Sequence, residues 1–194
     1  MAGGTHIYVP AFDPMGTVDA IAEHGVTHAL LVPTMIGMIV QHPDFDPAKL
    51  KTIERFMYGG SPMPEGVMRK SMELLPHVGF QQAYGQTEMA PLITVLDPED
   101  HILDGEHSNR LRSAGRPATG CEVKIIDEEG AEVPKGTIGE SKARSPGNML
   151  GYWQQPEQTE ATLVDGWVHT GDGAYQDEHG FVFIDRKSTR LNSS

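Results

Sequence analysis

The chain has 194 residues, a formal net charge of -12 and one cysteine. This acidic balance, with no basic patch, argues against nucleic acid or an anionic membrane as the main partner. The single Cys121 excludes an internal disulfide and fits a reducing compartment. The sequence shows neither a secretory leader nor an apolar run of membrane-spanning length, so we expect a cytoplasmic protein without a transmembrane segment. Composition does not define an oligomeric state.

In the first half of the chain, short apolar strand signals alternate with helix signals. The first helix illustrates the pattern, since Asp13 is a suitable N-cap and Gly25 a suitable stop. Strands alternating with helices of this length favour an α/β layer with a parallel or mixed sheet. The expected elements are strands at 6–10, 26–33 (buried), 55–60 and 79–85, and helices at 12–25, 34–42 and 63–75, with Val18, Ile21 and Ala22 on the apolar face of the first helix.

After Asp97 the pattern changes to short strands, with one helix signal at 156–163. The stretches 121–145 and 166–185 are each expected to form two strands, with turns at Asp127–Gly130 and Asp177–Gly180. The polar segment 97–113 is expected to be a loop whose acidic residues are solvated. The sequence therefore predicts an α/β fold with a β-rich second part.

The stretch Tyr84-Gly85-Gln86-Thr87-Glu88 follows a predicted strand, which places it where open α/β folds bind ligands. Tyr84 offers a flat face to a base, and Gly85 lets a ligand approach the backbone. The Thr87 hydroxyl can donate to a phosphate oxygen, and Glu88 is the hard oxygen ligand that Mg²⁺ prefers. The alternative is a strand end with one buried tyrosine and a solvated turn.

Two other turns contain residue types suited to a nucleotide. Gly59 and Gly60 lie between a strand and a helix and can form one wall of a pocket for a planar ligand, or only a turn. Asp172 can accept hydrogen bonds from a sugar diol, or only cap a hairpin turn. For the nearby Trp167 we expect a place in the core. The nine histidines lack the spacing of zinc sites, and no G-x-S-x-G elbow is present.

The order of the motifs is more specific than any one of them. Together, "YGGSPMP", "AYGQTE", "AGRPATGCEVKIID", "GTIGE", "GNMLGYW" and "DGWVHTGD" resemble the adenylate-forming (AMP-binding) superfamily, which includes acyl-CoA synthetases, peptide-synthetase adenylation domains and firefly luciferases. The resemblance extends from about Phe12 to Ile184. It implies part of the N-terminal domain of such an enzyme, with an α/β part at 1–96 and a β-rich subdomain at 97–184.

The resemblance also implies a reaction and a site. A carboxylate attacks the α-phosphate of ATP to give an acyl-adenylate and pyrophosphate, and a thiol, usually coenzyme A, then takes the acyl group. ATP, Mg²⁺ and coenzyme A are the implied cofactors, and a small carboxylic acid is the implied substrate. In the implied site, Gly59, Gly60 and Ser61 border the adenine and the acyl pocket, Tyr84 stacks on adenine beside Gly85, Thr87 contacts the α-phosphate, Glu88 holds Mg²⁺, and Asp172 binds the ribose hydroxyls.

The chain also departs from the family pattern. The family's phosphate loop would precede Met1, and its C-terminal domain with a catalytic lysine would follow Ser194, so we expect an internal fragment without synthetase activity of its own. Residues 185–194 match a translated sequencing adapter and are expected to be read-through, so Arg186 is not assigned to the site. We also expect exposed apolar surface, marginal stability and a tendency to aggregate.

Gln86 favours one branch of the superfamily. Peptide-synthetase adenylation domains usually carry proline at this position, whereas "YGQTEMAPLIT" is more similar to fatty-acyl and aryl-acyl CoA ligases. An acyl-CoA ligase is therefore the leading hypothesis. The alternatives are an amino-acid adenylation domain, a non-catalytic or degenerate nucleotide-binding module, and a structural or interaction protein.

Overall fold

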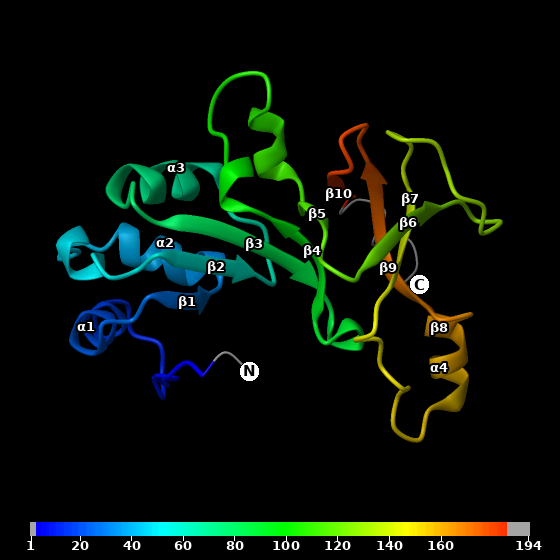
Figure 1. Cartoon of the computed structure of the whole chain (residues 1–194), viewed down its shortest axis with the longest axis horizontal. Coiled ribbons are helices and arrows are strands. Elements are labelled where there is room, and N and C mark those ends of the chain that lie inside the picture. Colours follow the sequence, from blue (N-terminus) through cyan, green and yellow to red (C-terminus); the bar gives the residue numbers. More distant parts are fainter. Residues whose placement is uncertain (1–2, 186–194) are drawn as a thin grey trace. The chain divides into compact units, whose positions relative to one another are not determined.

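The computed structural model describes residues 3–185 and contains two compact units, Met1–Gln81 and Gln82–Ser194 (Figure 1). The division falls within strand β3 (Gly79–Gly85). The predicted subdivision at residues 96 and 97 stays a prediction. Of the predicted read-through tail, all but Asp185 lies outside the described residues.

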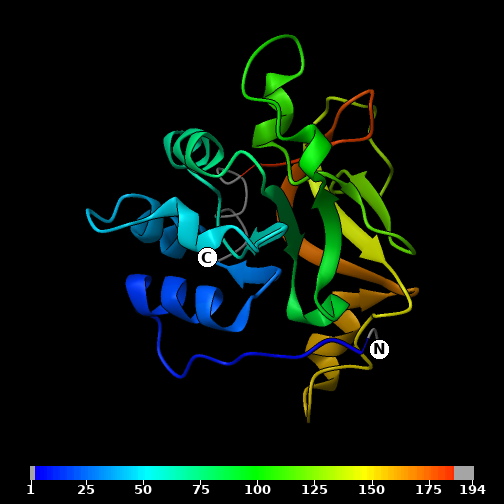
Figure 2. The same cartoon turned by 60° about the vertical axis from the view of Figure 1, so that its left-hand side comes forward.

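The first unit contains three α-helices and the parallel pair of strands β1 and β2. Residues His28 to Leu31 of β1 pair with Arg55 to Tyr58 of β2. Helix α2 contacts both α1 and α3 and lies between them (Figures 1 and 2). The elements are α1 (Pro14–His24), β1 (His28–Leu31), α2 (Pro33–Val40), the 3₁₀ turn η1 (Pro47–Leu50), β2 (Arg55–Gly59) and α3 (Glu65–Leu74).

Helix α1 begins and ends as predicted. The Asp13 carboxylate accepts a hydrogen bond from Gly16 N at 2.7 Å, and Gly25 ends the helix in the left-handed conformation with φ 59°. Val18 and Ile21 are buried, but Ala22 is exposed, which corrects the predicted apolar face. Thr17 is buried instead, because it lies one turn before Ile21 on the same face.

Two predictions about the first strands are wrong. Residues 6–10 form no strand, and Tyr8 is 86% exposed. Strand β1 forms but is not buried, because it ends the strand order of its sheet and leaves Leu30 71% exposed. Met38 is exposed as well, so the first unit has the exposed apolar surface that the sequence predicts.

The first sheet is mixed, as predicted. Its strand order is β1-β2-β3-β4-β5, and β4 (Leu92–Leu96) is antiparallel to both β3 and β5 (Arg116–Pro117). The pairing of β3 with β4 is irregular between Tyr84 and Gly85. A bulge of this kind re-aims the side chains at the end of a strand.

The second unit contains an antiparallel sheet with strand order β10-β9-β7-β6, and β8 pairs with β9. The turns predicted at Asp127–Gly130 and Asp177–Gly180 both form, each closed by a hydrogen bond from its glycine N–H to the first carbonyl oxygen. The predicted helix near 156–163 also forms. The elements after β4 are β5, β6 (Glu122–Ile126), β7 (Gly139–Arg144), α4 (Pro156–Thr162), β8 (Leu163–Val164), β9 (Trp167–Gln176) and β10 (Val182–Asp185).

Trp167 does not fill the core. Alternate residues of a strand face opposite sides, and the neighbouring Val168 takes the buried position. Trp167 is half-buried on the other face, where the cationic groups of Lys124, Lys142 and Arg144 lie 5.5, 5.5 and 4.7 Å from its ring. The indole is therefore covered by cation–π contacts instead of apolar packing.

The predicted loop at 97–113 is more ordered than its polarity indicates. It contains two short 3₁₀ turns, η3 (Pro98–Asp100) and η4 (Ser108–Arg112). Asp100 is buried and accepts hydrogen bonds from Arg110 at 2.9 Å and Arg116 at 3.2 Å. The prediction of solvated acidic residues is wrong at Asp100, because these two guanidinium groups compensate its burial.

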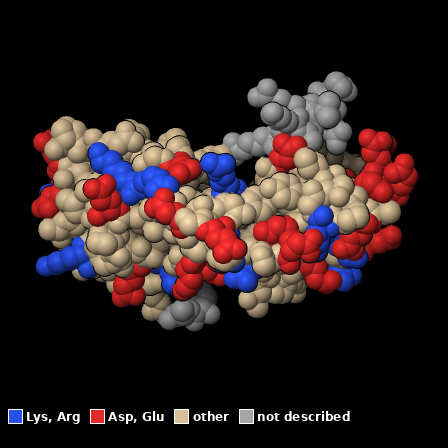
Figure 3. Space-filling view, turned by 90° about the horizontal axis from the view of Figure 1, so that it is seen from above, with Lys and Arg blue, Asp and Glu red and all other residues tan. Residues whose placement is uncertain are grey.

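Charged side chains of both signs are interspersed on the face that Figure 3 shows. None of the helices between residues 3 and 185 has the length and apolarity needed to cross a bilayer.

Candidate nucleotide site

A hydrogen bond joins two of the predicted site residues. The Tyr84 hydroxyl, at the end of β3, donates to Oδ2 of Asp172 on β9 at 2.6 Å. Burial first, and then the bond to Asp172, raise the pKa of the Tyr84 phenol above its usual value, so this group is a neutral donor at physiological pH. Oδ1 of Asp172 accepts no hydrogen bond from residues 3–185 and is free to accept one from a ligand.

The turn that carries Asp172 is an irregularity within β9 (Trp167–Gln176), which corrects the predicted turn after a strand. Glu140 pairs with Gly173 and Lys142 with His169, so three residues of β9 stand opposite Ser141 alone. Thr170 holds this bulged segment in place, because its hydroxyl donates to the Ser141 carbonyl oxygen at 2.7 Å and accepts from Asp172 N at 3.1 Å. The position of Asp172 therefore depends on Thr170.

Glu140 contacts the same turn through both carboxylate oxygens. Oε1 accepts from Gly171 N at 3.3 Å, and Oε2 lies 3.1 Å from Nδ1 of His169. Gly171 has φ 72°, a conformation that favours glycine. Glu140, His169 and Thr170 are not among the predicted site residues, although all three lie within the motifs that carry the family resemblance.

Gly85 and Thr87 shape the turn after Tyr84. A Cβ at Gly85 would lie 1.8 Å from the carbonyl oxygen of Pro91, so the chain itself requires glycine at this position. Thr87 begins the short 3₁₀ turn η2 (Thr87–Met89), is exposed, and has a hydroxyl without a hydrogen-bond partner in the described part of the chain. A phosphate oxygen can therefore reach this hydroxyl.

Glu88 is held by Tyr152, which is not among the predicted site residues. The Tyr152 hydroxyl donates to Glu88 Oε1 at 2.6 Å, and Met149 N donates to the Glu88 carbonyl oxygen at 2.8 Å. The hydrogen bond to Glu88 is the main cause of a raised pKa of the Tyr152 phenol. Tyr152 lies in "GNMLGYW", but no periodicity in that loop shows which side chain turns toward Glu88.

The residues around Glu88 fit Mg²⁺ better than they fit zinc. Within residues 3–185 there is no group of three or more His, Cys, Asp and Glu side chains that could enclose a metal. Mg²⁺ typically binds one or two carboxylates and completes its shell with water and nucleotide phosphates. Glu88 Oε2, which makes no hydrogen bond to the described residues, is a suitable single protein ligand.

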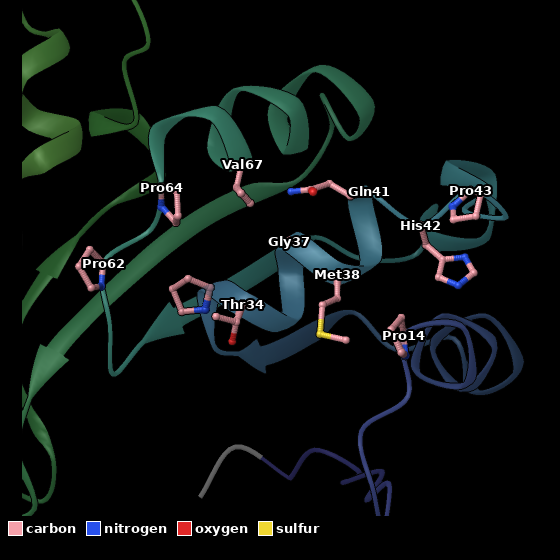
Figure 4. A pocket seen from close by; sticks show the side chains of 11 residues that line it. Pro14, Thr34, Gly37, Met38, Gln41, His42, Pro43, Pro62, Pro64 and Val67 are labelled. Atoms are coloured by element: carbon pink, nitrogen blue, oxygen red, sulfur yellow. The ribbon is translucent and has the colours of Figure 1, made fainter.

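Three predicted site residues lie in the first unit. Gly59 ends β2, Gly60 follows with φ 75°, and Ser61 is exposed in the connection to α3. Their predicted contact with the nucleotide stays a prediction. Directly after them, the same connection lines an apolar pocket of about 670 Å³ (Figure 4). Its lining includes Pro33, Thr34 and Met38 from α2, Val67 from α3, and Pro62 and Pro64.

The fold is that of the N-terminal domain of adenylate-forming enzymes. Among solved structures, the amide bond synthetase McbA from Marinactinospora thermotolerans has 34% identity and a TM-score of 0.82, over 91% of this chain and 34% of that one. The chain belongs to the AMP-binding enzyme family, whose profile matches residues 1–153. This membership confirms the resemblance inferred from the motifs.

Two curated relatives are ligases that differ in the acceptor of the acyl group. The fatty acid–[acyl-carrier-protein] ligase ScoC of Streptomyces coeruleorubidus is 39% identical over 94% of this chain and 34% of its own length. The medium/long-chain-fatty-acid–CoA ligase FadD8 of Mycobacterium tuberculosis is 36% identical over 94% of this chain and 31% of its own. The chain spans about a third of the length of these relatives.

Proposed function

We propose that the chain is part of an ATP-dependent acid–thiol ligase that activates a fatty or aryl acid as its acyl-adenylate and transfers the acyl group to coenzyme A. The observation that carries the proposal is the Tyr84–Asp172 hydrogen bond, with Glu88 four residues after Tyr84. An aromatic face and two carboxylates, which we assign to the sugar and to the metal, therefore lie in one compact unit.

The nucleoside is assigned to Tyr84 and Asp172. The bond from its hydroxyl fixes the Tyr84 ring, so that adenine stacks on a surface that is already ordered. Oδ1 of Asp172 accepts from the ribose hydroxyls, as acidic residues do in other nucleotide sites. Gly85 keeps the backbone beside the ring free of a side chain.

The phosphates are assigned to Thr87 and Glu88. The Thr87 hydroxyl donates to an α-phosphate oxygen, and Glu88 holds Mg²⁺. Bound there, Mg²⁺ would neutralise phosphate charge during the displacement. An oxygen of the acid attacks the α-phosphorus while the bond to pyrophosphate breaks. The thiolate of coenzyme A then attacks the acyl carbon, and AMP leaves.

The apolar pocket of the first unit supports a fatty or aryl acid. Pro62 and Pro64 directly follow the Gly59–Ser61 turn that is assigned to the border of the acyl pocket, and the other lining residues named above are largely apolar. A pocket of this size and lining suits an alkyl chain or an aromatic ring better than a charged amino acid. Coenzyme A is the proposed acceptor on the likeness to FadD8, and a carrier-protein thiol is the acceptor that the name of ScoC gives.

Calorimetric titration of the chain tests the nucleotide part of the proposal. A non-hydrolysable ATP analogue should bind, and bind more tightly with Mg²⁺ present. In Glu88→Ala the Mg²⁺ enhancement should disappear while metal-free binding persists. No binding by the wild-type chain contradicts the proposal.

The class of acid is tested with acyl-sulfamoyl adenosines, which mimic the acyl-adenylate. Fatty-acyl and aryl-acyl forms should bind more tightly than the aminoacyl form. A preference for aminoacyl forms would favour an amino-acid adenylation domain. Equal affinity for all three would leave a nucleotide-binding module without acid selectivity.

A further inference from the structure

We propose that Tyr152 is a positioning residue that holds the Glu88 carboxylate in the orientation in which its second oxygen meets a divalent cation. This inference rests on the proposed function and assigns a role to a residue outside the expected nucleotide contacts. It begins from the hydrogen bond between the Tyr152 hydroxyl and Glu88 Oε1 at 2.6 Å.

Glu88 lies partly buried in the short turn η2, and in the described part of the chain its side chain accepts a hydrogen bond from Tyr152 alone. A glutamate loses considerable rotamer freedom when a ligand fixes it, and that loss weakens binding. A donor already on Oε1 removes most of this cost and leaves Oε2 for the cation. The outer partners of ligating carboxylates fix geometry in this way at many metal sites.

Tyr152 is itself well anchored. Its backbone N–H donates to Oγ1 of Thr159 on α4 at 2.9 Å. The Thr159 hydroxyl in turn donates to the Gln155 carbonyl oxygen at 2.8 Å. Earlier in the loop, Met149 N donates to the Glu88 carbonyl oxygen. The loop therefore contacts Glu88 through both a backbone group and a side chain.

The neighbours of Tyr152 show that its orientation is specific. Leu150 is fully exposed and Trp153 is 85% exposed, whereas Tyr152 is half-buried with its hydroxyl on Glu88. General burial of the loop would not produce this contrast. The ordered contact of Tyr152 is with the proposed metal ligand.

Mn²⁺ binding tests the inference, because free Mn²⁺ is measured directly by electron paramagnetic resonance. The chain is saturated with α,β-methylene-ATP and titrated with Mn²⁺. Tyr152→Phe should weaken Mn²⁺ binding about tenfold while affinity for the metal-free nucleotide stays unchanged. Thr159→Val, which removes the anchor of the Tyr152 backbone, should give a smaller loss in the same direction.

Tyr175→Phe is the matched control. It deletes the same atom in the same unit, where Tyr175 stacks on Phe183 at 4.8 Å and its hydroxyl has no hydrogen-bond partner among residues 3–185. If Glu88→Ala loses Mn²⁺ binding while Tyr152→Phe binds Mn²⁺ as tightly as the wild-type chain or more tightly, the inference is overturned. Equal losses of metal and metal-free nucleotide affinity would also overturn it, since they would indicate a structural role alone. If the wild-type chain binds no Mn²⁺–nucleotide, the proposed function itself fails and the inference fails with it.

Discussion

The two carboxylates of the candidate site accept the same kind of hydrogen bond in different settings. In each, a phenol donates at 2.6 Å, from Tyr84 to Asp172 and from Tyr152 to Glu88. Tyr84 belongs to a strand and packs against a buried cluster that includes Ile93. Tyr152 belongs to a loop between exposed neighbours. The first bond therefore joins two strands of the fold, whereas the second joins a loop to the turn that carries Glu88.

Gly85→Ala should break both pairs, because the turn that it destroys connects Tyr84 with Glu88. The added Cβ would lie 1.8 Å from a backbone oxygen, so the chain must move. We expect a loss of about 3 kcal/mol or more in the free energy of unfolding. Tryptophan fluorescence in urea measures this loss in the second unit, since both tryptophans, Trp153 and Trp167, lie there.

Gly171→Ala is the control for that substitution. Gly171 has φ 72°, but an added Cβ there meets no atom within 4 Å. Only the conformational cost of about 1 kcal/mol should then appear. Equal losses at the two glycines would contradict the steric account of Gly85.

Tyr84→Phe and Tyr152→Phe should separate the two pairs. Removing the Tyr84 hydroxyl leaves a half-buried carboxylate without its donor, at a cost of about 1–3 kcal/mol. Tyr152 lies between exposed neighbours, so water can replace its hydroxyl at Glu88, and Tyr152→Phe should change stability by no more than about 0.5 kcal/mol. The urea midpoints of both variants measure the difference. Similar midpoints would mean that the two hydrogen bonds contribute equally to the stability of the fold, which contradicts this distinction.

Alkaline pH should change the stability of the Tyr84→Phe and Tyr152→Phe variants to different extents, and this difference is the smallest of the expected effects. Because the pKa of Tyr84 is raised on folding, the unfolded chain loses its proton first, at about pH 10. The resulting stability is complete below that pH and declines as the pH rises toward the native pKa. Tyr84→Phe should therefore lose less stability than the wild-type chain above pH 10. In Tyr152→Phe this reduction of the loss should be smaller. Part of the loss should persist in both, because burial also raises the pKa of Tyr58 in the first unit. An identical pH profile for wild type and Tyr84→Phe would contradict this assignment.

Local signals predicted most of the elements and the places of "YGGSPMP" and "YGQTE" at strand ends, but not that Asp172 lies within β9. The Asp13 cap, the turns at Asp127 and Asp177 and strand β3 depend on a few neighbouring residues, so the sequence contains the needed information. Asp100 and Trp167 were misjudged because distant cations determine their surroundings. Polarity and aromaticity alone do not reveal such partners.

The residues of the site were predictable by type, but their contacts were not. Tyr84 and Asp172 are 88 positions apart, and Tyr152 and Glu88 are 64 apart. The first contact depends on how strands pair and where they bulge, and the second on the path of the loop before α4; no local pattern encodes either geometry. Tyr152 and Glu140 could only be found once the chain was folded.

The central claim is that Asp172 binds the ribose and Glu88 binds the metal. It is tested most directly by calorimetric titration with non-hydrolysable ATP and its 2′,3′-dideoxy form, each with and without Mg²⁺. The wild-type chain should bind the ATP analogue more tightly than its dideoxy form, and its affinity for the analogue should rise when Mg²⁺ is present. Asp172→Ala should lose only the preference for the ribose hydroxyls. Glu88→Ala should lose only the increase in affinity that Mg²⁺ gives. If either variant loses both, or keeps both, the claim is wrong.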